Sequence, residues 1–220
     1  MKIEIKEVLR YLGYKNQKID ENTMNLVKTC SKELIAICKE RFVYEIFDIK
    51  RSDGEISLEN SMLVLKGNDI KNHLVNSNKC VIMAATLGIN VDSKIAYYSR
   101  SNITKALIMD ACATTAIENL CDEIQSEIMN SALENNLHIT NRYSPGYGDF
   151  SIHNQSDILN VLDAYKKIGL SVTESSIMLP RKSVTALIGL SEIANLKSKD
   201  KCKNCNNANC TFRKDGGNCV

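Results

Sequence analysis

One uninterrupted stretch, from Thr104 to Leu133, constrains the fold of this chain more than any other feature. It contains neither glycine nor proline, the two residues that most readily interrupt a helix. Residues recur on one face of it every three or four positions, the period of an α-helix. The recurring positions are Leu107, Asp110, Ala113, Ile117, Leu120, Ile124 and Ile128. We therefore predict one long helix with an apolar stripe.

Asp110 is the exception on this stripe, because a buried carboxylate without a partner is costly. Two interpretations are open. Asp110 either lies near the helix start and meets solvent or a neighbouring helix end, or it lines a binding site. We favour the first interpretation, since buried aspartates are rare unless they are paired.

The remaining segments are shorter and of mixed type. Helical spacing predicts a helix over residues 2–12, ended by Gly13, and another that Asp20 can cap. The buried face of that second helix would comprise Met24, Val27, Leu34, Ile35 and Cys38. Asp69 can cap a further short helix to Ser77, and Ser156 can cap one through Lys167 that is ended by Gly169.

Strands are predicted where β-branched and aromatic residues cluster. The predicted strands cover residues 42–49, 55–58, 62–65, 80–86, 172–179 and 183–190. Asp53-Gly54 is a hairpin turn signal between the first two. The strand over 80–86 is apolar throughout, which favours burial on both faces. Because the order lacks a regular βαβ alternation, we predict an α+β fold with a largely antiparallel twisted sheet, flanking helices and one long central helix.

Composition excludes several classes of function. The net charge of +2 gives no basic excess for nucleic acid or an anionic membrane, and there is no Trp for stacking on bases. No apolar run is long enough to span a bilayer, and no signal peptide is recognisable at the start. Five scattered cysteines are typical of small buried hydrophobes. We expect a cytoplasmic protein that binds neither nucleic acid nor membrane.

The segment Arg142-Tyr143-Ser144-Pro145-Gly146-Tyr147-Gly148-Asp149 is predicted to be a shaped binding loop. Its proline fixes one backbone angle, and its two glycines can adopt positive φ and let the backbone approach a ligand. The guanidinium of Arg142 suits a carboxylate. A second interpretation has equal weight on spacing alone: Pro-Gly is a common turn pair, and Arg142 would then only brace the turn.

The loop and several further motifs resemble a known family. The pattern Arg142-x-x-Pro145-Gly146-Tyr147 is followed by His153 and by three more elements. These are Leu170-x-x-Thr173-Glu174-Ser175, Met178-x-Pro180 and Ser183-Val184, with Tyr11-Leu12-Gly13-Tyr14 and Ala85-Thr86-Leu87-Gly88 nearer the start. Together they resemble the reactivation domain of cobalamin-dependent methionine synthase, in its free-standing bacterial form. The resemblance covers most of residues 1–195.

The resemblance implies a function. In this family the domain binds S-adenosylmethionine and presents its methyl group to cobalamin held by the synthase. It implies reductive reactivation: a low-potential donor such as flavodoxin or ferredoxin returns one electron to oxidised cobalamin, and methyl transfer regenerates methylcobalamin. The implied partner is a cobalamin-binding methionine synthase that lacks its own activation domain. Whether the chain is itself an enzyme or an activation subunit of that methyltransferase stays open.

The resemblance also implies site residues. Arg142 matches the arginine expected to bind the amino-acid part of S-adenosylmethionine, and Ser144, Gly146 and Tyr147 complete the cofactor-binding loop. No catalytic residue is implied. His153 matches as well, although a loop-bracing role is at least as plausible for it. Glu174 is either a structural or a site carboxylate.

The chain departs from the family where acidic residues are expected. Thr114 and Asn135-Asn136 occupy the corresponding stretches. Glu118, one turn beyond Thr114, is a candidate substitute, and the alternative is an exposed helix carboxylate. The Tyr-Tyr pair expected after the Ser-Val strand is replaced by Ile193-Ala194-Asn195-Leu196.

The end of the chain carries a separate motif, Cys202-x-x-Cys205-x4-Cys210-x8-Cys219. Two thiolates spaced C-x-x-C can share one metal ion, and four suit zinc or an iron–sulfur cluster. The alternative is a tail with free thiols. We therefore predict an activation-like domain over residues 1–196 and a cysteine-rich, metal-binding tail over 197–220.

A function of another class remains open. The chain could instead be a non-catalytic, metal-tailed docking or regulatory module that recognises a corrinoid protein without methyl transfer. A generic methyltransferase is disfavoured, because no glycine-rich Rossmann loop is present.

Overall fold

The computed structural model describes residues 3–15 and 17–193. Its helices are α1 (Ile5–Tyr11), α2 (Glu21–Ile37), α3 (Asn68–His73), α4 (Ile89–Ser101), α5 (Ile103–Glu134), α6 (Asn154–Val161) and α7 (Ala164–Ile168). Its strands are β1 (Arg41–Ser52), β2 (Glu55–Leu58), β3 (Val64–Leu65), β4 (Lys79–Thr86), β5 (His138–Ile139), β6 (Ser171–Val172), β7 (Met178–Leu179) and β8 (Ser183–Ser191).

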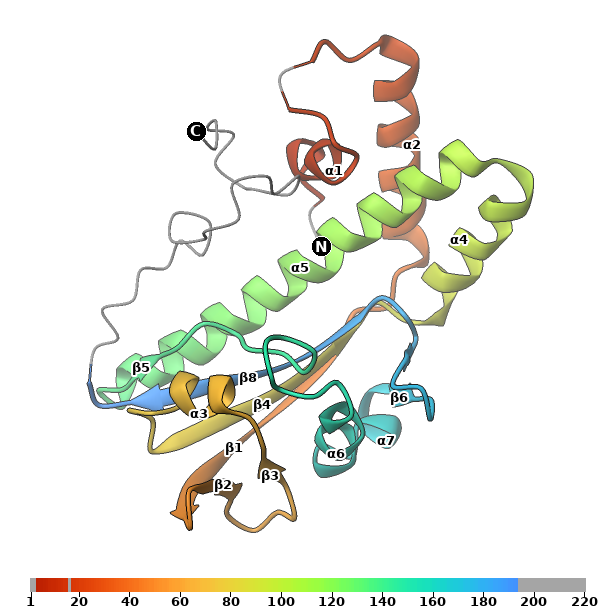
Figure 1. Cartoon of the computed structure of the whole chain (residues 1–220). Helices are drawn as coiled ribbons and strands as arrows, with labels where there is room; N and C mark the ends of the chain where they lie inside the picture. Colours follow the sequence, from red (N-terminus) through yellow and green to blue (C-terminus); the bar gives the residue numbers. More distant parts are fainter. Residues whose placement is uncertain (1–2, 16, 194–220) are drawn as a thin grey trace.

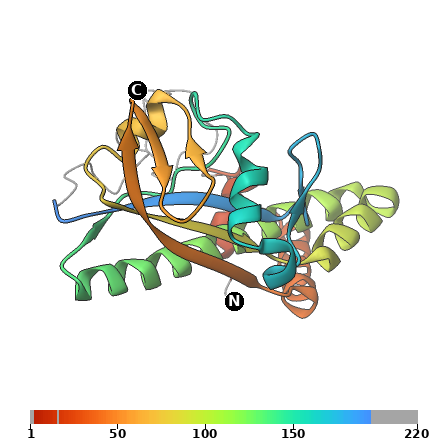
Figure 2. The same cartoon turned by 90° about the horizontal axis from the view of Figure 1, so that it is seen from below.

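The central layer is a six-stranded sheet in the order β3-β2-β1-β4-β8-β5, with every pair antiparallel. Figure 1 shows this twisted sheet with α5 lying along one face, together with α1, α2 and α4. The short helices α6 and α7 cover the opposite face, as the view from below in Figure 2 shows. The predicted fold class, α+β with an antiparallel sheet and one long helix, is confirmed.

Strand β4 explains why the fold has two cores. Its residues alternate between the faces of the sheet, as the two-residue period of a strand requires. Val81, Met83 and Ala85 join the core beneath α5, whereas Cys80, Ile82 and Ala84 join the core beneath α3, α6 and α7. The predicted burial of this strand on both faces is confirmed.

The long helix forms as predicted, from Ile103 to Glu134, and Asn102 caps it by accepting a hydrogen bond from the Lys105 amide at 3.0 Å. Two stripe assignments were wrong: Leu107 is 61% exposed, and in α2 Ile35 is 47% exposed. The buried face of α5 combines the predicted Ile117, Leu120, Ile124 and Ile128 with small residues, among them Ala106, Ala111, Cys112, Ala113 and Ala116. The small residues let α5 lie close against its neighbours α1, α2 and α4.

The expected helix over residues 156–167 is broken in two. Asp163 adopts a left-handed conformation with φ of 50°, which separates α6 from α7. Leu162 and Ala164 on either side of it are both fully buried. The bend therefore lets the end of α6 and the start of α7 both face the core. Asp tolerates this conformation better than most residues.

The expected strand over residues 172–179 is instead a hairpin of β6 and β7. The turn is closed by the Thr173 amide, which donates to the Ile177 carbonyl at 2.9 Å, and by the Thr173 hydroxyl, which accepts from the Ile177 amide at 3.1 Å. Ser176 in the turn has φ of 61°. Local hydroxyl hydrogen bonds of this kind compete with extended structure.

Candidate functional site

The predicted binding loop is anchored at both of its ends. Tyr143 exchanges two backbone hydrogen bonds with Leu187 of β8, at 2.9 and 2.8 Å, and thereby extends the edge of the sheet beyond β5. Further along, the Gly146 amide donates to the Phe150 carbonyl at 2.8 Å, and the Phe150 amide donates to the Tyr147 carbonyl at 3.0 Å. Phe150 is fully buried, so the turn between these residues is fixed to the core.

Both loop glycines have positive φ, 92° at Gly146 and 52° at Gly148, as the sequence predicted. Gly148 is also required for space. A Cβ atom there would overlap Asp69 Oδ2 and lie 2.9 Å from the Tyr143 hydroxyl. The loop backbone is therefore pressed against α3 at a position where a side chain does not fit.

Two aspartates connect the loop to α3 by hydrogen bonds. The Asp149 carboxylate accepts from the backbone amides of Asn68 at 2.6 Å and Asp69 at 2.9 Å, and so caps the helix from 80 residues away. In return, Asp69 accepts from the Asp149 amide at 3.1 Å. The amides of Asp69 and Asn68 lower the pKa of Asp149 by stabilising its charged form. The expectation that Asp69 caps α3 was wrong, since it lies inside the first turn and Gly67 is at the cap position.

Arg142 faces the opposite side of the sheet, toward α5. Its side chain is only 15% exposed, and its guanidinium forms ion pairs with Asp122 at 2.8 Å and Glu118 at 3.3 Å. It also donates to Gln125 Oε1 at 2.9 Å. The three partners are spaced three or four residues apart, so they share one face of the helix. We call Arg142, Glu118, Asp122 and Gln125 the arginine cluster.

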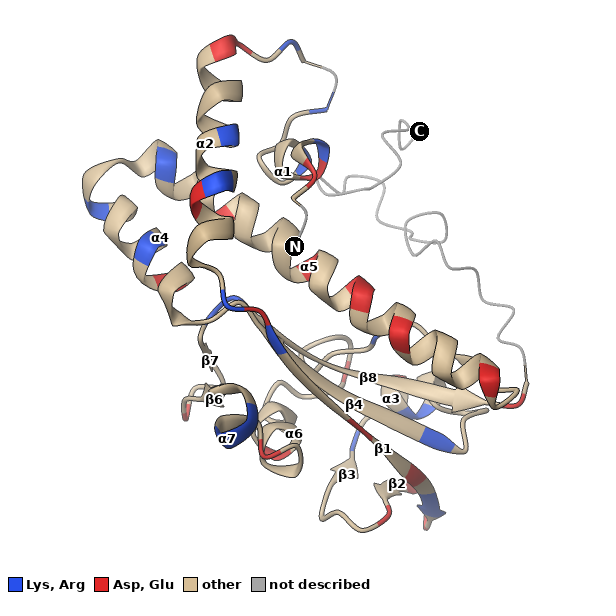
Figure 3. Cartoon of the chain, turned by 180° about the vertical axis from the view of Figure 1, so that it is seen from behind, with Lys and Arg blue, Asp and Glu red and all other residues tan. Residues whose placement is uncertain are grey.

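Besides Arg142, the arginine cluster contains one residue that the sequence predicted and two that it did not. Glu118, the candidate substitute for a missing acidic residue, does lie against Arg142. Asp122 and Gln125 were missed, although their spacing from Glu118 would have indicated them once a ligand was placed on that face. Acidic residues recur along α5 toward its C-terminal end (Figure 3). Tyr11 of α1 lies close enough that the Glu118 carboxylate adds to the rise in its pKa, which is caused mainly by burial.

On the α3 side, the loop carries aromatic rings. Tyr143 contacts His73, Tyr147 and Phe150, with ring centroids 4.9, 6.2 and 6.3 Å apart. His73 is held through Nε2, which lies 2.9 Å from both the Asn141 carbonyl and the Thr140 hydroxyl. Tyr147 is 64% exposed and presents its ring to solvent. The loop thus offers a guanidinium on one side of the sheet edge and an open aromatic surface on the other.

A cleft of about 530 Å³ lies beside the loop along the β5 edge. Its walls come from α3, from the last turns of α5 and from the chain between β5 and the loop. The lining residues are Asp69, Asn72, His73, Val75, Asn76, Met129, Leu133, Leu137, His138, Ile139, Thr140, Asn141 and Tyr143. Met129 is one helical turn from Gln125, so the cleft continues the same face of α5 as the arginine cluster. We call this space the edge cleft.

The other predicted residues lie outside this arrangement. His153 Nδ1 lies 3.1 Å from the Ser176 hydroxyl, so it braces the loop's exit against the β6–β7 turn. Glu174 is exposed in that turn. Asp110 is exposed and forms an ion pair with Lys182 at 2.9 Å, as the first interpretation of that residue expected.

Two further features concern metal binding and membrane spans. Within residues 3–15 and 17–193, no group of three or more His, Cys, Asp or Glu side chains could hold a metal ion. The four tail cysteines, Cys202, Cys205, Cys210 and Cys219, lie outside the described residues. No helix in the described part of the chain has the length and apolar character needed to cross a membrane.

Comparison with known proteins supplies independent findings. A family model described as vitamin B12-dependent methionine synthase, activation domain, matches residues 68–204. Among solved structures, the fold is similar to that of the MetH reactivation domain bound to AdoHcy, with a TM-score of 0.64 and 14% sequence identity. That alignment covers 89% of this chain and 72% of the other. A search of curated protein sequences found no match.

Proposed function

Because the chain belongs to the family of vitamin B12-dependent methionine synthase activation domains, we propose that it supports reductive reactivation of such a synthase. In this proposal the chain binds S-adenosylmethionine and presents its methyl group to cobalamin held by the partner. The observation that carries the proposal is the arginine cluster beside the loop. It brings a guanidinium that is 15% exposed close to two carboxylates, which together offer the opposite charges that a zwitterionic ligand needs.

The charges of the arginine cluster complement those of S-adenosylmethionine. The ligand carries a carboxylate, an ammonium group and a sulfonium, with a net charge of +1. Arg142 with Glu118 and Asp122 carries a net charge of −1. The ligand carboxylate can replace one acidic partner of Arg142, and the displaced carboxylate can then receive the ammonium group. After this exchange every charged group still has a partner. This matters because a nearly buried guanidinium without an ion-pair partner would be strongly destabilising.

The edge cleft suits the rest of the ligand. Its volume of about 530 Å³ lies within the usual range of about 300–1,000 Å³ for small-molecule sites. Met129 and Leu133 provide apolar contacts for a nucleoside, and Asn72 and Asn141 provide polar groups. We infer that the amino-acid part lies at the arginine cluster and the adenosine in the edge cleft.

The loop residues then have distinct roles. Ser144 and Gly146 bring backbone groups to the ligand, and Tyr147 covers it with an exposed ring. Both sides of the sheet edge contribute, because β5 is the last strand of the sheet, has only two residues and is followed on the same edge by the loop. The loop thus fills the position that a longer strand would occupy.

Binding of S-adenosylmethionine can be tested by isothermal titration calorimetry. Arg142→Ala removes a charge-assisted contact worth about 1.5–3 kcal/mol, so the Kd should rise about 10- to 150-fold. Arg100→Ala, in the exposed last turn of α4, is the matched control and should leave the Kd unchanged. If the wild-type protein shows no detectable binding and Arg142→Ala leaves methylcobalamin formation unaffected, the chain is a docking module that does not take part in methyl transfer.

Charge complementarity makes a second measurement informative. S-adenosylhomocysteine lacks the sulfonium charge but keeps the same shape, apart from the methyl group. We expect the wild-type protein to prefer S-adenosylmethionine, and Asp122→Asn to reduce this preference by about 0.5–1 kcal/mol, the size of a partly screened charge interaction. An unchanged preference in Asp122→Asn would show that the cluster does not recognise the methylated cofactor.

The remaining features of the proposal rest on the sequence. We propose a cytoplasmic protein with a domain over residues 1–196 and a cysteine-rich tail over residues 197–220. Its partners would be a cobalamin-binding methionine synthase and a low-potential electron donor such as flavodoxin or ferredoxin. The tail thiols would hold zinc or an iron–sulfur cluster. An anaerobic preparation of the full chain that contains neither iron nor zinc would rule out the metal in the tail.

A further inference from the structure

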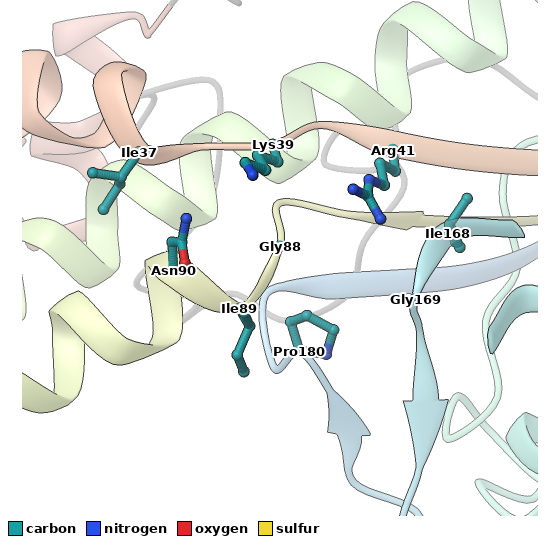
Figure 4. Close-up of a pocket in the computed structure, with 9 residues that line it drawn as sticks. All are labelled: Ile37, Lys39, Arg41, Gly88, Ile89, Asn90, Ile168, Gly169 and Pro180. Carbon is teal, nitrogen blue, oxygen red and sulfur yellow. The ribbon is translucent and has the colours of Figure 1, made fainter. Parts of the chain in front are cut away.

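A second pocket lies at the opposite end of the sheet, where α2 leads into β1 and β4 leads into α4. It has a volume of about 200 Å³ and is lined by Ile37, Lys39, Arg41, Gly88, Ile89, Asn90, Ile168, Gly169 and Pro180. We call it the cationic pocket. Figure 4 shows Lys39 and Arg41 along one side of it, with Ile89 and Pro180 opposite.

Close packing of the backbone builds this corner. The Lys39 amide donates to the Leu87 carbonyl at 2.9 Å, which holds the chain against the end of β4. Gly88 has φ of 85°, and a Cβ atom there would lie 3.3 Å from Lys39 Cβ. Thr86 Oγ1 accepts from the Gly88 amide at 3.2 Å and from the Ser183 hydroxyl at 2.8 Å. The pocket therefore has a defined shape.

The charge in the cationic pocket has one sign. Of its nine lining residues two are cations and none is a carboxylate. Lys39 and Arg41 are separated by one residue of extended chain, so their side chains leave the backbone on the same side. Neither forms an ion pair within the described part of the chain. The nearest acidic group on α4, Asp92, accepts a hydrogen bond from the Arg181 amide at 2.5 Å.

The start of α4 adds partial positive charge to the same space. This helix has 13 residues; no side chain caps it, and the acidic residue of its first turn, Asp92, accepts from the Arg181 amide outside the helix. Gly88, Ile89 and Asn90, which begin it, all line the pocket. The Gly88 amide donates to Thr86 and the Val91 amide to the Gly88 carbonyl, whereas the amides of Ile89 and Asn90 have no acceptor among the described residues and favour an anion. The backbone here reinforces the two cationic side chains.

We propose that the cationic pocket binds the phosphate group of a small phosphate ester. Arg41 and Lys39 would bind the phosphate oxygens, as these side chains commonly do. The apolar wall of Ile37, Ile89, Ile168 and Pro180 would contact the organic part of the ligand. The volume lies below the range of about 300–1,000 Å³ for pockets that enclose drug-sized molecules, so the ligand is small.

This site is separate from the proposed S-adenosylmethionine site. Pro180 leads into the start of β8 at Ser183, whereas the binding loop pairs with Leu187, four residues further along the strand. At about 3.3 Å per residue, the two positions on β8 are roughly 13 Å apart. Substitutions in the cationic pocket should therefore leave S-adenosylmethionine binding unchanged, and failure of one proposal does not decide the other.

The test is a titration of the full chain followed by amide chemical shifts in NMR, at constant ionic strength. Inorganic phosphate and phenyl phosphate are the two probes, and sodium chloride is the blank. Saturable shifts at Lys39 and at Gly88 to Asn90 would support the proposal. Tighter binding of phenyl phosphate would support an ester as the ligand, whereas equal binding of the two probes would overturn the ester and leave a site for free phosphate.

Charge-matched variants identify the groups responsible. Arg41→Gln and Lys39→Gln should each raise the Kd by about tenfold or more, the effect of losing one charge-assisted contact. Lys28→Gln, at an exposed position on α2, removes the same charge elsewhere and should leave the Kd unchanged. Unperturbed shifts far from the pocket show that each variant folds. The absence of saturable shifts with both probes, or an equal loss in Lys28→Gln, would overturn the proposal.

Discussion

Replacing Gly148 with alanine tests whether the binding loop is held by its contact with α3. Alanine at the Gly148 φ of 52° costs about 1–2 kcal/mol from the left-handed backbone alone. The new Cβ would also overlap Asp69 Oδ2. If Asp69 moves away, the loop loses its hydrogen bond from the Asp149 amide, worth about 1 kcal/mol. We therefore expect a total loss of about 2–3 kcal/mol in the free energy of unfolding.

Gly54→Ala is the matched control. Gly54 also has positive φ, 75°, but a Cβ atom there meets nothing within 4 Å. Both substitutions change the entropy of the unfolded chain equally, so this contribution cancels between them. Gly148→Ala should be the more destabilising by about 1 kcal/mol, which corresponds to a difference in Tm of about 2–4 °C for a chain of this size.

Chemical denaturation of the two variants measures this difference, and a double substitution identifies its cause. In an Asp69→Ala background the overlap with the carboxylate is absent, so Gly148→Ala should cost less than it does in the wild type. Equal destabilisation by Gly148→Ala and Gly54→Ala, or strict additivity with Asp69→Ala, would refute the idea that α3 fixes the loop.

Three further predictions concern single groups. Asp149 has a lowered pKa because backbone amides of α3 donate to its carboxylate. The wild type should therefore exceed Asp149→Asn in unfolding free energy above pH 3.8, the ordinary pKa of this group, and lose this difference as the pH falls through the lower pKa of the folded state. Stability–pH curves that run parallel for the two proteins would contradict this. Tyr98→Phe removes a hydrogen bond to Glu33 and should cost about 1 kcal/mol in denaturation experiments, whereas Tyr97→Phe, at a 61% exposed position, should cost nothing measurable. Burial raises the pKa of the Cys80 thiol to about 12, so mass spectrometry should find it unmodified by iodoacetamide at neutral pH unless the protein unfolds.

Periodic patterns predicted most of the fold. The hairpin at Asp53-Gly54, the doubly buried β4 and the long helix α5 each follow from local periodicity or turn chemistry. The helix α4 was not predicted. Ile117, Leu120, Ile124 and Ile128 are buried as the stripe predicted, whereas Leu107 is 61% exposed and the first turns of α5 bury Ala106, Ile108 and Met109. A hydrophobic pattern shows that a helix buries a face, but the elements packed against the helix decide which residues of that face are covered.

The site was less predictable than the fold, since its contacts join residues far apart in the chain. The sequence located the loop and the need for its two glycines. It did not show that Asp149 would cap α3, because the two segments are separated by about 80 residues. Nor did it show that Arg142 would face Asp122 and Gln125, which depends on how α5 lies across the edge of the sheet.

The position of Arg142 next to Tyr143 explains why the proposed site lies at the sheet edge. Successive residues of an extended chain point to opposite faces. Arg142 therefore reaches the α5 layer, while Tyr143 and the ring of Tyr147 lie with α3. A ligand that contacts both must cross the edge of the sheet, and it can do so only where no further strand is paired. β5 is the last strand of the sheet, and the loop that follows it pairs with Leu187 of β8 on the same edge, so no further strand of the described residues covers this edge.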